Sequence, residues 1–338
     1  MKVFIRYFWI ISIYVGSFLQ LNAQKIIEIK GVSVTVSNLN EALKFYTEVL
    51  PFQKDTAFTL KGLYIQQLFN IKDTSLKIEI ARLHLGNEHI ELMEFHSTLF
   101  ERRKILADSR SNDLWFQHIA IVVSDMPKAY QKLLDNEVTH VSTAPQTLPD
   151  YIPAAAGISA FYFRDPDGHN LELIHFPTGK GNPKWQAQNE NLFLGIDHTA
   201  IGIESTQKSL DFYNHVLGLQ VAGQSENYGT EQEHLNQVFG ARLKITGLKA
   251  NSGIGLELLD YIAPQGGRPY PDDTKATDIW YWQTTVEVTN INKLYKTLKE
   301  QGYEIISDKL VEIGVFGLGA KMGFIARDSD GHFIFFKE

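Results

Sequence analysis

The stretch that decides the fold is FRDPDGHNLELIHF, which runs from Phe163 to Phe176. Its Asp-Pro-Asp-Gly segment favours a tight turn, because Pro presets φ and Gly tolerates positive φ. The apolar run that follows has the length of a strand and contains one carboxylate, Glu172. A carboxylate inside an apolar strand must be paired, protonated or bound to a metal, because its desolvation is costly. Glu172 is therefore the first candidate functional residue.

The end of the chain repeats this stretch as ARDSDGHFIFFKE, from Ala326 to Glu338. The turn residues return in register, but Phe335 stands at the position that corresponds to Glu172. The chain therefore contains an internal repeat, and one copy of the repeat has lost its carboxylate. We interpret the turn histidines, His169 and His332, as structural residues.

Four stretches have the pattern of a strand, a capping turn and a helix, and they begin near residues 26, 118, 196 and 284. Asp125 and Asn290 stand where the N-caps of the second and fourth helices are expected. Strand-like runs follow each opening, and after the first helix they include GLYIQQLFNI at 62–71. The sequence thus predicts an α+β fold of four βαβββ modules.

The order of the modules along the chain divides it into two halves. We expect the first two modules to form one domain at 26–177 and the last two to form another at 193–338. A turn-rich linker at 178–192 separates them.

Residues 1–23 have the pattern of a secretory signal peptide. Lys2 and Arg6 precede an apolar run that is shorter than a membrane helix requires, and Ala23 offers a small residue for cleavage. The sequence therefore predicts an exported protein, periplasmic or secreted. The alternative is an uncleaved N-terminal anchor.

The composition limits the partners of the mature protein. A formal net charge of −7 argues against a nucleic-acid partner, and the absence of Cys excludes disulfides and thiol chemistry. No segment after the first residues is long and apolar enough to span a membrane. We expect a small-molecule substrate as partner, and a monomer or a homodimer.

Three features together resemble the vicinal oxygen chelate (VOC) superfamily, which includes glyoxalase I, extradiol dioxygenases and bleomycin-resistance proteins. They are FYNHVLGLQ at 212–220, FYFRDPDGHNLELI at 161–174, and a His that opens two of the modules. The resemblance covers 26–338 and implies two VOC domains. It also implies metal ligands on the first and last strands of each module. The matching positions are Gly31, His118, His198 and Gln283 on first strands, and Glu91, Glu172, Glu257 and Phe335 on last strands.

The pairing of modules decides which of these residues meet. Pairing in chain order would divide the candidate ligands between two incomplete sites. Crossed pairing, of the second module with the third and of the first with the fourth, would complete one site. The other site would hold Gly31, Glu91, Gln283 and Phe335 and would not bind a metal. The complete site would contain His118, Glu172, His198 and Glu257. We expect the crossed pairing, because one whole set beside one empty set is the simpler account.

Imidazole and carboxylate ligands suit a divalent Zn, Ni, Co, Mn or Fe ion and not Ca. The resemblance implies a glyoxalase I-like isomerase or lyase, in which the metal stabilises an enediolate and a glutamate moves the proton. Glu172 and Glu257 are the candidates for that role, and the resemblance favours Glu172. One alternative is an extradiol ring-cleavage dioxygenase with Fe(II). The other is a metal-free protein that binds a small ligand, as in resistance or sequestration.

Overall fold

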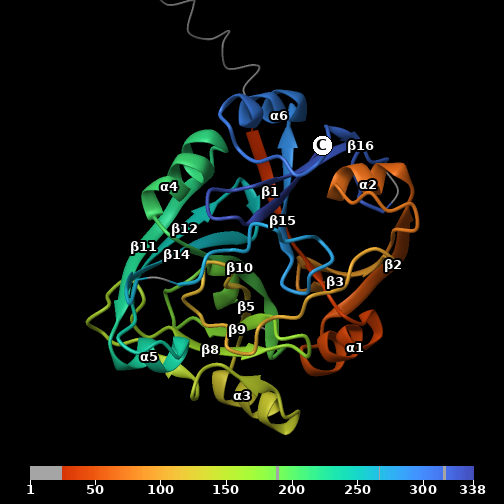
Figure 1. Ribbon diagram of the computed structural model, residues 1–338. Coiled ribbons are helices and arrows are strands. Elements are labelled where there is room, and N and C mark those ends of the chain that lie inside the picture. Colours follow the sequence, from red (N-terminus) through yellow and green to blue (C-terminus); the bar gives the residue numbers. More distant parts are fainter. Residues whose placement is uncertain (1–24, 188–189, 266, 315–316) are drawn as a thin grey trace, which may run out of the picture.

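The computed structural model describes residues 25–187, 190–265, 267–314 and 317–338 (Figure 1). The expected signal peptide at 1–23 lies outside the described residues. The described chain has short helices packed around two nine-stranded sheets, which confirms the α+β class. No helix in these ranges is long and apolar enough to cross a membrane.

Modules 1 and 4 form one sheet, named here the 1+4 sheet. Its strands are β1 (Lys25–Thr35), β2 (Gln53–Lys61), β3 (Lys77–Leu85), β4 (Glu88–His96), β13 (Ser252–Gly253), β15 (Trp282–Thr289), β16 (Val311–Glu312), β17 (Met322–Arg327) and β18 (Phe333–Lys337). The order across the sheet is β16-β17-β18-β15-β1-β4-β3-β2, and β13, from module 3, pairs with β1.

Modules 2 and 3 form the other sheet, named the 2+3 sheet. Its strands are β5 (Gln117–Val123), β6 (Thr139–His140), β7 (Gln146–Thr147), β8 (Ser159–Arg164), β9 (Asn170–His175), β10 (Phe193–Ile203), β11 (Gln220–Tyr228), β12 (Arg242–Lys249) and β14 (Gly255–Ala263). The order is β11-β12-β14-β10-β5-β9-β8-β6, and β7 pairs with β8.

The two sheets confirm the crossed pairing of modules. The first strands of modules 1 and 4 meet as the antiparallel pair β1–β15, and those of modules 2 and 3 meet as β5–β10. Figure 1 shows the red β1 beside the blue β15, although they lie at opposite ends of the chain. Each half of the sequence, 26–177 and 193–338, therefore contributes one module to each sheet.

The helices are α1 (Leu39–Lys44), α2 (Leu63–Phe69), α3 (Met126–Asp135), α4 (Thr206–Leu210), α5 (Thr230–Asn236) and α6 (Ile291–Glu300). Two π-helical turns, η2 (Phe45–Val49) and η4 (Asp211–Val216), extend α1 and α4, and the linker contains a 3-10 turn, η3 (Pro183–Gln186). Asp125 caps α3 by accepting a hydrogen bond from the Lys128 N–H, and Asn290 caps α6 from a left-handed conformation.

The prediction of a strand at 62–71 was wrong, because this segment forms α2. Its buried residues Ile65, Leu68 and Phe69 follow the spacing of a helical face, and its two Gln residues lie between them. Gly62 starts the helix with a φ of +110°, a conformation that few other residues adopt. A short apolar run does not distinguish a strand from a buried helix by periodicity alone.

Strand alternation separates the main core from the face of the 2+3 sheet that carries the candidate ligands. All of β5 is buried, and its Ile119, Ile121 and Val123 belong to a large apolar core that joins both sheets and the helices. His118 and Ala120 alternate with them and therefore project from the opposite face.

The two DGH turns attach one sheet to the other. The Tyr46 hydroxyl donates to Asp165 at 3.2 Å, and the His169 ring contacts Asp165 and the Ile279 carbonyl at 2.8 and 2.6 Å. In the second copy, the Tyr213 hydroxyl donates to Asp328, and Nε2 of His332 lies 2.7 Å from the Gly202 carbonyl. Both turn histidines are thus buried and hydrogen-bonded, which confirms the structural interpretation.

Candidate metal centre

Four neighbouring strands of the 2+3 sheet carry the candidate ligands. In the order β14-β10-β5-β9, they place Glu257, His198, His118 and Glu172. The register puts Ala120 opposite both Glu172 and His198, and Ala200 opposite both Glu257 and His118. Because these alanine side chains are small, they leave room on this face of the sheet for the four longer polar side chains.

The structure brings the ligand atoms of these residues together. Oε2 of Glu172 lies 3.1 Å from Nε2 of His118 and 3.7 Å from Nε2 of His198. Ligand atoms of these three residues all lie within 4.8 Å of one another. Glu257 contacts the cluster through Nε2 of His198, at 3.3 Å. All four residues expected from the sequence therefore meet at one place.

The polar atoms at this place fit a metal ion. Both ring nitrogens of His118 and Nε2 of His198 are buried and have no hydrogen-bond partner among the described residues. Buried imidazole nitrogens are rarely left without a partner in proteins. The side chains of His118, His198 and Glu172 are 1%, 4% and 6% exposed, whereas that of Glu257 is 30% exposed. Two imidazoles and two carboxylates are a donor set that suits a divalent transition metal.

The carboxylates near the two imidazoles shift the pKa values of His198 and Glu257. Burial opposes a charged His198, but Glu257 and Asp197 outweigh it and raise the pKa of His198 to about 10 in the metal-free chain. Burial raises the pKa of Glu257, and the nearby Glu172 adds to this effect. A bound cation would relieve the repulsion between the two carboxylates.

Asp197 is a supporting residue that the sequence reasoning missed. Its Oδ2 lies 3.0 Å from Nδ1 of His198, and its Oδ1 accepts a hydrogen bond from the Trp185 indole at 2.5 Å. Trp185 belongs to the linker at 178–192, so this hydrogen bond connects the linker to the site. Strict alternation would send the side chains of Asp197 and His198 to opposite faces. The register of β10 shifts between Ile196 and His198, which brings the two side chains together.

The described residues give no such ligand set at the matching place in the 1+4 sheet. Glu91 accepts hydrogen bonds from Arg82, at 2.6 Å, and from Ser33. Gln283 accepts one from the Tyr281 hydroxyl, and Phe335 is buried. The Cβ of any residue replacing Gly31 would lie 2.0 Å from a backbone oxygen. The one carboxylate left at these positions is therefore committed to an arginine.

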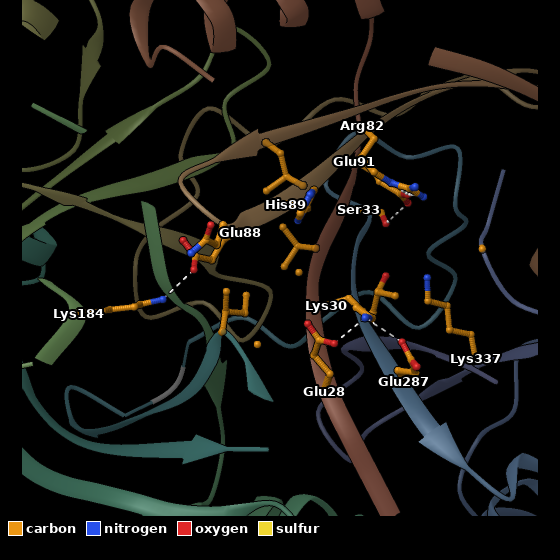
Figure 2. A pocket seen from close by; sticks show the side chains of 18 residues that line it. Glu28, Lys30, Ser33, Arg82, Glu88, His89, Glu91, Lys184, Glu287 and Lys337 are labelled. Carbon is orange, nitrogen blue, oxygen red and sulfur yellow. Dashed lines mark hydrogen bonds and ion pairs between the residues drawn. The ribbon is translucent and has the colours of Figure 1, made fainter. Parts of the chain in front are cut away.

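A cavity of about 500 Å³ lies at this second place, and Figure 2 shows that ion pairs line it. Lys30 lies between Glu28 and Glu287, at 2.5 and 2.9 Å, and Lys184 contacts Glu88 at 2.7 Å. Glu88 also accepts a hydrogen bond from the Ile196 N–H. The linker and the β3–β4 hairpin thus connect the wall of this cavity to the strand that carries His198.

Comparison with known proteins gives a family match in both halves of the chain. The model of the Glyoxalase/Bleomycin resistance protein/Dioxygenase superfamily matches residues 28–173 and 195–336. The expected pair of VOC domains in tandem is therefore confirmed.

Two curated proteins resemble parts of the chain. A 2-epi-5-epi-valiolone epimerase from Actinomyces sp. is 31% identical over 158 residues, which are 45% of this chain and 81% of that protein. Glyoxalase I from Saccharomyces cerevisiae is 31% identical over 113 residues, which are 33% of this chain and 31% of that protein.

Solved structures share the fold across nearly the whole chain. A mutant form of glyoxalase I from Zea mays has a TM-score of 0.60 at 15% identity, covering 94% of each chain. A putative dioxygenase from Bacillus subtilis has a TM-score of 0.54 at 14% identity, covering 93% of this chain and 86% of that one. At these identities the likeness concerns the fold.

Proposed function

Because the chain belongs to the Glyoxalase/Bleomycin resistance protein/Dioxygenase superfamily, we propose that it is a metal-dependent enzyme of the glyoxalase I type. It would move a proton at a carbon that carries one of two neighbouring oxygens of a small substrate. The observation that carries this proposal concerns the Nε2 atoms of His118 and His198. Both are buried beside the Glu172 carboxylate and have no hydrogen-bond partner among the described residues.

His118, Glu172, His198 and Glu257 would hold the ion, which can be Zn, Ni, Co, Mn or Fe. When bound, the ion would act as a Lewis acid that stabilises the negative charge developing on the substrate oxygens. The remaining chemistry falls to the carboxylates of the chain.

The two glutamates approach the site from opposite sides. Glu172 lies on β9 and Glu257 on β14, the outer neighbours of the central pair β5–β10. Glu172 is nearly buried between the two imidazoles, so it suits removal of a proton away from water. Glu257 is 30% exposed, so it can return a proton that exchanges with solvent. Carboxylates on two sides of a carbon also suit an epimerisation, the reaction type named for the Actinomyces relative.

One observation favours a second candidate function. The tight cluster contains two histidines and one carboxylate, while Glu257 adjoins it through its ion pair with His198. Two histidines and one carboxylate with open positions are the ligand set of Fe(II) oxygenases. An extradiol-type dioxygenase therefore remains the alternative, and a metal-free binding protein is the outcome if no ion is found.

The test is elemental analysis of protein purified without added metal, followed by two assays on the loaded protein. One assay measures deuterium exchange at the carbon next to the carbonyl of hemithioacetals and α-hydroxyketones, and the other measures oxygen uptake with catechols. We expect about one ion per chain and exchange without oxygen uptake. Oxygen uptake would favour the dioxygenase, and a metal-free protein without either activity would contradict the proposal.

A further inference from the structure

Helices α2 and α5 occupy the same place in modules 1 and 3, so the residues around one helix can be compared with those around the other. Gly62 and Gly229 precede them with φ values of +110° and +95°. Each helix has seven residues and ends at a left-handed residue, Asn70 or Gln237. Figure 1 shows α2 beside the strands of the 1+4 sheet and α5 beside those of the 2+3 sheet. Each residue of α2 therefore has a matching residue in α5.

Four matched positions around these helices differ in chemistry as a set. Near α2 they are apolar and buried, namely Leu60, Ile65, Phe69 and Phe95. Near α5 they are polar and equally buried, namely Asn227, Gln232, Asn236 and Tyr261. We call the second set the polar quartet. The matched residues contact each other in both halves, but the kind of contact differs. Phe69 packs edge-to-face on Phe95, whereas the Asn236 amide donates to the Tyr261 hydroxyl.

The polar quartet is not satisfied by its own hydrogen bonds. The Gln232 amide donates to Oδ1 of Asn236, but Oε1 of Gln232 and Oδ1 of Asn227 are buried and have no partner among the described residues. A buried acceptor without a donor costs about 1–3 kcal/mol. The other half of the chain shows that an apolar set fills the same positions without this cost.

The polar quartet lies on the face of the sheet that carries the metal ligands. Tyr261 follows Glu257 by four residues on β14, which places it on the same face about 13 Å along the strand. Tyr162 connects the two places. It pairs with Glu172 across β8–β9, its ring lies 5.0 Å from the His118 ring, and it belongs to the same apolar cluster as Tyr261.

We infer that the polar quartet binds the end of the substrate remote from the metal, and that this end carries hydroxyl groups or similar hydrogen-bond donors. The two unpartnered groups are acceptors, so they require donors from the ligand. This assignment rests on the proposed function, since it takes the reacting end of the substrate to lie at His118 and His198. The substrate class is therefore a polyhydroxylated α-hydroxycarbonyl compound.

The experiment compares two ketones that differ in hydroxyl groups alone. Erythrulose and 1-hydroxybutan-2-one share a four-carbon chain and neighbouring oxygens at C1 and C2. Exchange of their C1 protons is followed by NMR in D₂O with metal-loaded protein. The variants are Asn227→Leu and Gln232→Ile, singly and together. Leu and Ile are the residues at the matching positions of the first half, Leu60 and Ile65. Gln207→Leu, an exposed amide on α4, is the control.

The wild type should exchange erythrulose at least about tenfold faster than 1-hydroxybutan-2-one, as kcat/KM. The double variant should lose this preference while its metal content, circular dichroism and exchange of 1-hydroxybutan-2-one stay unchanged, and the control should behave as the wild type. Equal exchange of both ketones by the wild type, or an equal effect of the double variant on both, would overturn the inference.

Failure of the proposed function gives a different result. If metal-loaded wild type exchanges neither these ketones nor the hemithioacetals, the proposed reaction is contradicted, and the polar quartet is judged by binding alone. Saturation-transfer NMR should then detect erythrulose on the wild type and a signal at least about tenfold weaker on the double variant. No erythrulose signal on the wild type, or an equal signal on both proteins, overturns the inference.

Discussion

Asp197 accepts a hydrogen bond from Nδ1 of its neighbour His198, at 3.0 Å. A carboxylate can only accept, so this contact keeps a proton on Nδ1 and makes Nε2, which faces the ligand cluster, the nitrogen available to a metal. The Trp185 indole holds the other oxygen of Asp197. The segment that connects the two halves of the sequence therefore helps to orient one candidate metal ligand.

Replacing Asp197 should weaken metal binding without removing any ligand. We expect Asp197→Ala to raise the metal dissociation constant about 10- to 100-fold. Trp185→Phe, which removes one donor to Asp197, should have a smaller effect in the same direction. The measurement is competition with a chromophoric chelator, and Asp150→Ala, at an exposed Asp, is the control. Unchanged affinity in Asp197→Ala would show that the contact has no role in orientation.

The two glutamates should respond differently to amide substitution. Glu172→Gln should keep most of the metal and lose about 10²–10⁴-fold in turnover, because an amide cannot take up the proton. His118→Ala and His198→Ala should lose metal and turnover together. Metal stoichiometry and kcat are measured on the same preparations. If Glu172→Gln keeps its turnover while Glu257→Gln loses it, Glu257 is the base.

His169 should make stability depend on pH. Burial opposes its charge, but Asp165 outweighs burial and raises the pKa of His169 to about 8, against 6.5 for an unperturbed ring. The protonated ring therefore stabilises the fold below about pH 6.5, and this stability is lost as pH rises through about 8. The shift corresponds to about 2 kcal/mol.

Chemical denaturation at pH values from 6 to 9 measures this dependence. The free energy of unfolding should fall across that range in the wild type and should fall less in His169→Gln, which cannot titrate. Identical slopes in the two proteins would contradict the assignment to His169.

Export is a prediction from the first residues of the chain. The mature protein should begin near Gln24 and should be recovered outside the cytoplasm, because the apolar run after Lys2 and Arg6 suits a cleaved signal. N-terminal sequencing of protein from fractionated cells tests this. Soluble cytoplasmic protein that still begins with Met1 would contradict it, and membrane-bound protein with Met1 would support an uncleaved anchor.

The candidate ligand positions could be located from the sequence because the family resemblance implies them and the repeat marks the matching residues. His118 and His198 lie on the first strands of their modules, and Glu172 and Glu257 lie on the last strands. A repeat keeps these positions in register even where the side chains differ. The crossed pairing followed from counting which combination makes a whole set. Neither step required knowledge of distances.

The features that the sequence did not predict depend on local backbone geometry or on polar atoms that lack a hydrogen-bond partner. Helix α2 has an apolar run as short as a strand, and Asp197 reaches His198 through a register shift that alternation does not reveal. The unpartnered acceptors of Asn227 and Gln232 become visible when the surroundings of each atom are known. A sequence states which groups are polar, but it does not state which of them lack a partner.

The β1–β15 pairing has a consequence for synthesis of the protein. Residue Lys25 pairs with Thr289, so an early strand waits for nearly the whole chain before its edge is covered. Contacts this distant in sequence slow folding, and uncovered strand edges promote aggregation in the meantime. β5 waits only for β10, at the start of the second half, whereas β1 lacks its antiparallel partner until residues 282–289 have been translated. This edge of β1 therefore stays uncovered for a long interval, and translation rate should influence the yield of folded protein.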